Sequence, residues 1–218
     1  MSLDIEDILQ KLFAHYGRQR YEGPDDILGV LVRTILSQQT TRQNCRRAFG
    51  NLVDTFGGDW DRIRRAPLDE LVEVIAVAGL ARQKGRRIQA LLERLDKTRE
   101  SYDLEFLREM DVDRAREYLT QFKGVGPKTA AFVLMYAAGM SAFPMDTHIF
   151  RICQRLGLID EAMSSKAAHR RMEELIPARD HYSAHMVLVR HGREICHAQN
   201  PECERCPLDE LCPFPCSE

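Results

Sequence analysis

Residues 122–130 read Phe-Lys-Gly-Val-Gly-Pro-Lys-Thr-Ala, and residues 143–149 read Phe-Pro-Met-Asp-Thr-His-Ile. The first stretch predicts a helix, a tight turn and a second helix. Gly124 and Gly126 permit a sharp bend, and Pro127 suits the first position of a new helix. Glycine N–H groups at a helix start form an anion site, and phosphate is the usual anion. The stretch therefore predicts a turn that binds a phosphate.

Two chemically useful side chains stand at predicted helix starts. Lys128 lies in the first turn after Pro127, where the helix dipole disfavours the ammonium form. A neutral amine is the nucleophile of Schiff-base chemistry, and we expect burial in a cleft to supply most of the stabilisation that it needs. Asp146 precedes a predicted helix and is expected to be its anionic N-cap. The ordinary interpretations are a solvated surface lysine and a simple cap.

Two other phosphate-binding motifs are excluded by single residues. The Walker loop requires glycine before Lys-Thr, where this chain has Pro127. The dinucleotide fingerprint fails because position 129 is threonine and no strand is predicted before the loop.

Together the two stretches resemble the helix-hairpin-helix and catalytic aspartate of the endonuclease III family of DNA glycosylases. The matching segments are Gly124–Ala130 and Met145–Arg151. With the cysteines described below, the resemblance covers most of the chain. It implies that Lys128 and Asp146 are catalytic. It also implies that the hairpin binds the DNA backbone through Gly124, Val125 and Gly126.

The predicted fold class is all-α. Apolar residues recur at helical spacing, as at Ile5, Ile8 and Leu12, and we expect roughly ten helices and no strand. The resemblance implies a two-lobed helix-hairpin-helix glycosylase fold with Lys128 and Asp146 facing each other across a cleft. One lobe is a six-helix barrel of residues 24–135, with the hairpin at about 113–138. The other is discontinuous and combines residues 1–23 with 136–218.

Four cysteines near the C-terminus have the spacing C-x6-C-x2-C-x5-C: Cys196, Cys203, Cys206 and Cys212. Spacing alone leaves open a zinc site or an iron–sulfur cluster. The resemblance implies a 4Fe-4S cluster in the loop 196–212. The family's loop usually carries basic residues toward DNA, but residues 197–202 contain no Lys or Arg. We expect Cys216 to be a spare thiol, and Cys45 and Cys153 to be core residues.

Several other residues are candidates for DNA contact. Arg82, Lys84, Arg86 and Arg87 form a basic cluster, of which Lys84 and Arg86 are the preferred backbone contacts, although most such clusters are simply solvated. A polar group, Ser37-Gln38-Gln39, follows a predicted buried helix. The resemblance implies that Gln39, rather than Gln38, fills the space left by an extruded nucleotide.

The resemblance implies base excision DNA repair on double-stranded DNA that contains a damaged base, expected to be an oxidised pyrimidine, or an abasic site. Lys128 would attack the sugar C1′ and form a Schiff base, Asp146 would stabilise the developing positive charge, and β-elimination would cut the strand. The alternatives are a mismatch or modified-cytosine glycosylase, a non-catalytic DNA-binding hairpin module and a zinc-dependent regulatory protein. An adenine glycosylase would need a glutamate where Thr34 stands.

The composition is compatible with these expectations. The chain has 218 residues, 44% of them hydrophobic, and a net charge of −2, which excludes a protein coated in positive charge but not a local basic stripe. Seven cysteines without a signal-peptide pattern favour metal ligation over disulfides. We expect a monomer without a membrane span that is cytoplasmic and associated with the nucleoid.

Overall fold

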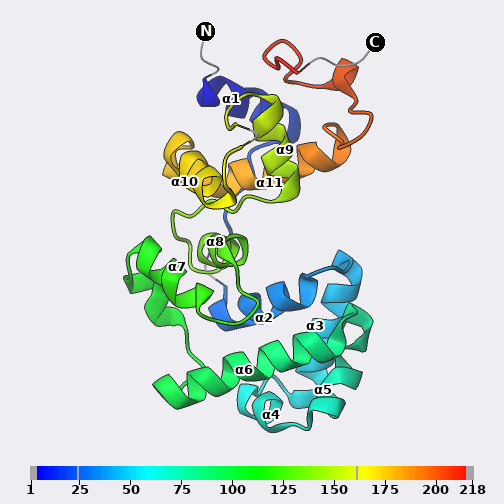
Figure 1. Ribbon diagram of the computed structural model, residues 1–218, viewed down its shortest axis with the longest axis vertical. Helices are drawn as coiled ribbons and strands as arrows, with labels where there is room; N and C mark the ends of the chain where they lie inside the picture. Colours follow the sequence, from blue (N-terminus) through cyan, green and yellow to red (C-terminus); the bar gives the residue numbers. More distant parts are fainter. Residues whose placement is uncertain (1–3, 24, 161, 215–218) are drawn as a thin grey trace. The chain divides into compact units, whose positions relative to one another are not determined.

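The computed structural model describes residues 4–23, 25–160 and 162–214, and within them the chain is helical (Figure 1). It divides into two compact units. Unit 1 comprises residues 1–23 and 139–218, and unit 2 comprises residues 24–138. No strand occurs in the described ranges, which confirms the all-α prediction. No helix in this part of the chain has both the length and the apolar character of a membrane span.

Unit 2 carries the predicted hairpin. Its described α-helices are α2 (Ile27–Ser37), α3 (Arg42–Phe56), α4 (Trp60–Arg65), α5 (Leu68–Val74), α6 (Ala81–Arg99), α7 (Val112–Thr120) and α8 (Pro127–Tyr136). Two 3-10 turns, η1 (Ala76–Ala78) and η2 (Glu105–Glu109), connect them. The predicted central helix is α2, and it packs on α3, α6 and α8.

Helix α2 is buried because almost every side chain on it is apolar. Ile27, Leu31 and Ile35 have no exposed surface, as predicted from the nearly continuous apolar run. Asp26 caps its start, and the carboxylate accepts the N–H groups of Leu28 and Gly29. The helix ends at Ser37, so the polar glutamines that follow emerge directly from the core of unit 2.

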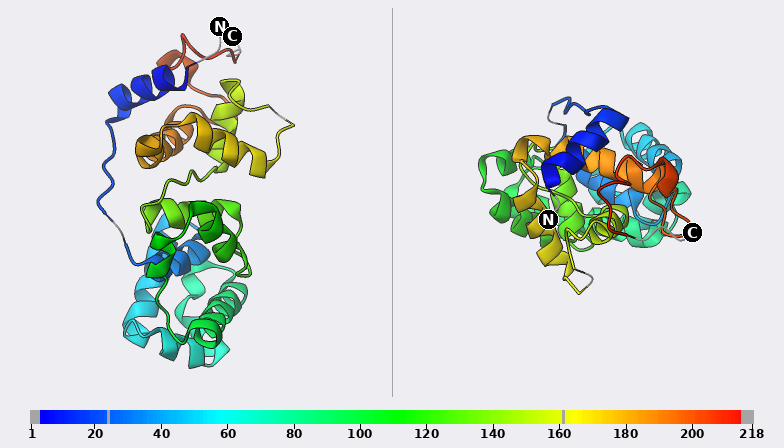
Figure 2. Two further views of the ribbon diagram at one scale, coloured as in Figure 1. Left: turned by 90° about the vertical axis from the view of Figure 1, so that its left-hand side faces the viewer. Right: turned by 90° about the horizontal axis from the view of Figure 1, so that it is seen from above.

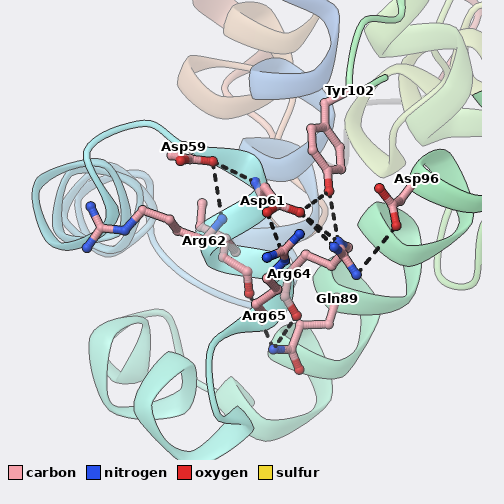
Figure 3. A network of polar contacts seen from close by, with 9 residues as sticks. Asp59, Asp61, Arg62, Arg64, Arg65, Gln89, Asp96 and Tyr102 are labelled. Atoms are coloured by element: carbon pink, nitrogen blue, oxygen red, sulfur yellow. Dashed lines mark hydrogen bonds and ion pairs between the residues drawn. The ribbon is translucent and has the colours of Figure 1, made fainter. Parts of the chain in front are cut away.

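A polar network stabilises unit 2 where α4 meets α6 (Figure 3). The guanidinium group of Arg64 donates to Asp61 at 2.7 Å and to the hydroxyl of Tyr102 at 2.8 Å. Gln89 on α6 donates to the carbonyl of Ala66 at 2.7 Å. Hydrogen bonds from Arg64 and Tyr102 lower the pKa of Asp61, so the carboxylate is held as the anion.

Unit 1 carries the second motif and the cysteine loop. Its described helices are α1 (Ile5–Tyr16), α9 (Thr147–Arg155), α10 (Ser165–Leu175) and α11 (His181–Glu194), with 3-10 turns η3 (Ala178–Asp180) and η4 (Cys203–Arg205). Helix α11 packs on both α1 and α9 (Figure 2). One apolar core joins these helices and includes Leu12, Ile149 and Leu188. The N-terminal helix therefore packs with C-terminal ones.

Candidate functional site

The turn between α7 and α8 is the predicted phosphate-binding turn, and its two glycines have different surroundings. Gly124 has a φ of +88°, and a Cβ there would lie 2.7 Å from Cδ of Arg87. A Cβ on Gly126 would meet nothing within 4 Å. Gly124 is therefore required by the shape of the turn, whereas Gly126 leaves open space beside the start of α8.

The start of α8 has no side-chain cap. Gly126 occupies the N-cap position and has no side chain to accept a hydrogen bond, and Pro127 begins the helix. A helix start without a cap presents backbone N–H groups and the positive end of the dipole to an approaching anion. These features suit the predicted phosphate site.

Val125 does not suit the predicted DNA contact. Its side chain is only 5% exposed, and its N–H donates to the carbonyl of Phe122 at 3.0 Å. Phe122 is itself buried. Neither the side chain nor the N–H of Val125 is available to a phosphate, so this prediction is wrong. Val125 instead anchors the turn in the core of unit 2.

A groove of about 750 Å³ in unit 2 brings together three segments that are far apart in sequence. They are the turn after α2, the turn before α6 together with the first turns of α6, and the hairpin. We call it the unit 2 groove; its lining residues are Gln38, Gln39, Leu80, Gln83, Lys84, Arg87, Gly124, Val125 and Gly126.

The two glutamines of the groove have different environments. The amide of Gln38 donates to the carbonyl of Gly124 at 2.9 Å and accepts from Arg87 at 2.7 Å. Gln38 therefore links α6 to the hairpin. Gln39 is exposed and has a φ of +51°, which is uncommon for a residue other than glycine. Its side chain is more exposed than that of Gln38, and the preference for Gln39 stays a prediction.

Leu80 is a residue that the sequence interpretation missed. It is 51% exposed and has a φ of +50°. A left-handed backbone is uncommon at a residue other than glycine, and here it belongs to an exposed leucine that lines the groove. The only sequence signal is its position, directly after Gly79 and before the basic cluster.

The structure corrects the prediction for Lys84. Its side chain is 1% exposed, and Nζ donates to the carbonyl oxygens of Leu36 at 2.7 Å and Ala78 at 2.8 Å. Burial lowers the pKa of this amine. Lys84 therefore cannot contact a phosphate as predicted. Arg86 is exposed on α6 and remains a candidate contact.

Lys128 is the second residue of α8, as the sequence predicts. Its side chain is exposed. The sequence predicts that a cleft between the two lobes buries the amine, and unit 2 by itself leaves this side chain exposed. Lys128 lies in the first turn of α8, directly after the uncapped helix start.

Asp146 is the N-cap of α9, as predicted. Its carboxylate accepts the N–H of Ile149 at 2.8 Å, and the residue is half-buried. One carboxylate oxygen is therefore used by the helix start. The backbone of Asp146 is extended, with φ −99° and ψ 176°, which is ordinary N-cap geometry.

The segment before Asp146, residues 142–145, is buried and held by polar side chains that the sequence interpretation missed. Glu173 accepts the N–H of Phe143 at 2.9 Å, and Nδ1 of His185 lies 3.1 Å from the carbonyl oxygen of Pro144. These groups come from α10 and α11. They fix the path of the chain into Asp146, so this carboxylate sits on a rigid support.

The four predicted cysteines line one cavity of about 400 Å³ in unit 1. Burial is the main cause that raises the pKa of the Cys206 and Cys212 thiols, and the nearby Cys196 thiol adds to both shifts. Guanidinium Nη1 of Arg155 lies 3.1 Å from Sγ of Cys196. The residues present therefore suit an iron–sulfur group in donor type and in their shared cavity.

The cavity as described has two further properties. Among the described residues, no three His, Cys, Asp or Glu side chains are placed closely enough to hold a metal ion. Cys203 is disulfide-bonded, and a ligand role requires that bond to be reduced.

Cys45 and Cys153 are buried, as expected of core residues. Cys216, expected to be a spare thiol, lies outside the described residues.

Several known proteins are similar to this chain over most of its length. Residues 32–178 match the family described as HhH-GPD superfamily base excision DNA repair protein. Endonuclease III of Sulfolobus acidocaldarius is 32% identical over 190 residues, covering 87% of this chain and 82% of that protein. Endonuclease III of Thermotoga maritima is 30% identical over 210 residues, covering 96% and 92%.

Solved structures of endonuclease III are similar to this chain as well. A trapped endonuclease III–DNA covalent intermediate is similar with a TM-score of 0.81 and 28% identity, covering 96% of this chain and 94% of that one. A non-covalent endonuclease III–DNA complex gives the same values. These findings confirm the resemblance on which the sequence predictions depended. The chain therefore belongs to the HhH-GPD superfamily of base excision DNA repair proteins, and within it to the endonuclease III type of DNA glycosylase.

Proposed function

We propose that this chain is a bifunctional DNA glycosylase and AP lyase that removes damaged bases, above all oxidised pyrimidines, from double-stranded DNA. The observation that carries the proposal is the position of Lys128. It is an exposed amine on the first turn of an uncapped helix, directly after a glycine turn. A backbone phosphate bound at this turn would bring the adjoining deoxyribose within reach of the amine.

The reaction begins when the neutral amine of Lys128 attacks C1′ of the damaged nucleotide. The C1′–N bond breaks, the electron pair leaves with the base, and the carboxylate of Asp146 stabilises the positive charge that develops on the sugar. Asp146 also assists removal of a proton from the attacking nitrogen. Opening of the sugar ring leaves a Schiff base between C1′ and Lys128. Loss of a C2′ proton then expels the 3′ phosphate and cuts the strand.

The bound duplex completes the surroundings of Lys128. Because its side chain is exposed in the free protein, DNA must displace the water that stabilises its ammonium form. We therefore assign to the substrate the desolvation that the sequence alone suggested the protein would supply. The amine becomes a better nucleophile when a nucleotide occupies the site.

Base excision requires extrusion of the damaged nucleotide from the stack. We assign two side chains of the unit 2 groove to the vacated space: Gln39, as the sequence predicted, and Leu80. An exposed leucine is suited to enter a stack of bases, because proteins commonly insert apolar wedges between base steps. Arg86 is assigned to backbone contact. A single copy of the chain provides all of these groups, with units 1 and 2 as its two domains.

We also propose that the cysteine cavity of unit 1 holds a 4Fe-4S cluster, with Cys196, Cys203, Cys206 and Cys212 as ligands. Four thiolates are the donor set that such clusters use. When bound, the cluster would supply rigid cross-linking of the C-terminal loop. The guanidinium of Arg155 would donate to Sγ of Cys196 and to the carbonyl of His197, which it reaches at 3.1 and 2.7 Å.

Covalent trapping tests the amine. Borohydride should reduce the Schiff base and leave a stable protein–DNA adduct on a duplex that contains thymine glycol. Lys128→Ala should abolish the adduct while DNA binding is retained. Lys123→Ala is the matched control, because Lys123 is an exposed lysine in the same turn, and it should trap normally. An adduct with Lys128→Ala would refute the proposed nucleophile.

Absorption and metal analysis test the cluster. The protein prepared without oxygen should be brown, with broad absorption at ~400 nm from thiolate–iron charge transfer. Cys206→Ala should lose both the colour and the iron, whereas Cys45→Ala should keep them. A colourless protein with stoichiometric zinc would contradict the assignment.

A further inference from the structure

The buried ammonium group of Lys84 connects two segments of unit 2. Its ammonium donates to the carbonyl oxygen of Leu36 at 2.7 Å and to that of Ala78 at 2.8 Å. The first carbonyl lies at the end of α2 and the second ends η1. Helix ends leave carbonyl oxygens without helical partners and carry partial negative charge, so a buried cation is a suitable partner for both.

Each of the two carbonyl groups lies shortly before a turn that lines the unit 2 groove. Leu36 is followed closely by the turn that carries Gln39, and Ala78 is followed closely by the turn that carries Leu80. Gln39 and Leu80 have φ values of +51° and +50°. Left-handed conformations at residues other than glycine persist where the surrounding structure imposes them. One buried amine therefore fixes the chain just before each of these two turns.

We propose that Lys84 is a positioning residue for nucleotide extrusion, which ties the turn of Gln39 to the turn of Leu80. The inference rests on the proposed wedge role of those two side chains. With the tie intact, both side chains enter the duplex at a fixed separation, and no ordering of the two turns is needed at the moment of extrusion. Without it, the turn of Gln39 is still held to α6 and to the hairpin through Gln38, but it is no longer tied to the turn of Leu80.

The experiment compares two substrates that contain the same abasic site, one in duplex DNA and one in single-stranded DNA. Borohydride trapping on the single strand requires Lys128 but no extrusion from a stack. Lys84→Met removes all three donors at nearly constant side-chain length. We expect the trapping rate on duplex DNA to fall at least tenfold and the rate on the single strand to stay within twofold of wild type.

Two controls separate positioning from loss of stability. Ile63→Ala, at a fully buried position on α4, which carries neither turn, should destabilise unit 2 and affect both substrates equally. In a Gln39→Ala, Leu80→Ala background, Lys84→Met should cause no further loss on the duplex, because its effect acts through those two side chains. Ile63→Ala should lower the trapping rate in that background by the same factor as in the wild-type chain.

If Lys84→Met does not fold, Lys84→Gln carries the same comparison, since its amide can still reach one carbonyl, and the duplex rate should fall by a smaller factor. Equal losses on duplex and single strand, or no loss on the duplex, would overturn the inference. Absence of an adduct with the wild-type chain on either substrate would overturn the proposed function itself, and this inference with it.

Discussion

The start of α8 and the start of α9 carry the two proposed catalytic side chains, and they differ in how the helix end is satisfied. At α8 the N-cap is Gly126, no side chain caps the helix, and Lys128 is exposed. At α9 the N-cap is Asp146, whose carboxylate accepts the N–H of Ile149 at 2.8 Å.

This difference determines whether each helix start can bind an anion or a group with positive charge. An uncapped start attracts an anion such as a phosphate, because its N–H groups and dipole are unopposed. A start that is capped by its own aspartate already holds an anion, and that carboxylate is suited to a partner with positive charge. DNA offers both partners, as a backbone phosphate and as a sugar that develops positive charge when the base leaves.

The largest effect is expected when the charge at α9 is removed but the cap is kept. Asn caps a helix as well as Asp does, so Asp146→Asn should leave thermal stability nearly unchanged while the excision rate falls about 10²- to 10⁴-fold. Asp146→Ala should lose the same activity and also about 1 kcal/mol of stability. Single-turnover excision and thermal unfolding measure the two effects. Full activity in Asp146→Asn would reduce Asp146 to a structural cap.

The second-largest effect, on DNA affinity, is expected from substitutions of the two glycines of the hairpin. Gly126→Ala places a methyl group in open space beside the uncapped helix start, so DNA affinity should fall about tenfold at a stability cost below about 1 kcal/mol. Gly124→Ala should lose affinity and also stability by about 1–2 kcal/mol, because alanine is strained at φ +88°. Titration with a fluorescent duplex and thermal unfolding distinguish the variants. Equal stability losses would mean that Gly126 is structural too.

A smaller effect tests whether unit 2 has a phosphate contact besides the start of α8. Arg86→Ala should weaken binding a few-fold and reduce the slope of log K against log salt by about 1. Arg82→Ala is the matched control on the same helix, because Arg82 is already paired with Asp69 at 2.5 Å, and it should leave the slope unchanged. Identical slopes for wild type and Arg86→Ala would leave the hairpin as the principal contact.

The smallest effect concerns the stability of the unit that carries α8. Because Arg64 and Tyr102 lower the pKa of Asp61 in the folded state, this group stabilises unit 2 above the unfolded pKa of about 3.9. That contribution disappears as the pH falls through the lower folded value. Asp61→Asn should therefore unfold at a slightly lower temperature than wild type at pH 7, and the difference should vanish well below pH 4. A difference that persists in acid would contradict the assignment.

The helix starts at both motifs could be predicted from sequence because their signals are local. Proline at the first helical position and aspartate at an N-cap act within a few residues. The same is true of Asp26 at the start of α2. The fold class followed from helical periodicity, which is also a local property.

Contacts between distant segments could not be predicted in this way. The carbonyl partners of Lys84 come from residues 48 and 6 positions away, and His185 reaches a carbonyl 41 positions away. For Lys84 one signal was available. It lies four residues before Ile88, on the same stripe as Leu91 and Leu95, so the helical period itself places it on the buried face. Its neighbouring arginines made it resemble a surface charge.

The contact between Gly124 and Arg87 has a consequence for how this turn can change during evolution. The guanidinium side chain of Arg87 occupies the volume that a Cβ at position 124 would need, and it is held there by its bond to Gln38. A larger residue at 124 would displace Arg87 from Gln38 unless position 87 had shortened first, and it would also have to accept a left-handed backbone, as Asn does. A change at position 87 that precedes the change at 124 therefore avoids the loss of the Arg87–Gln38 contact.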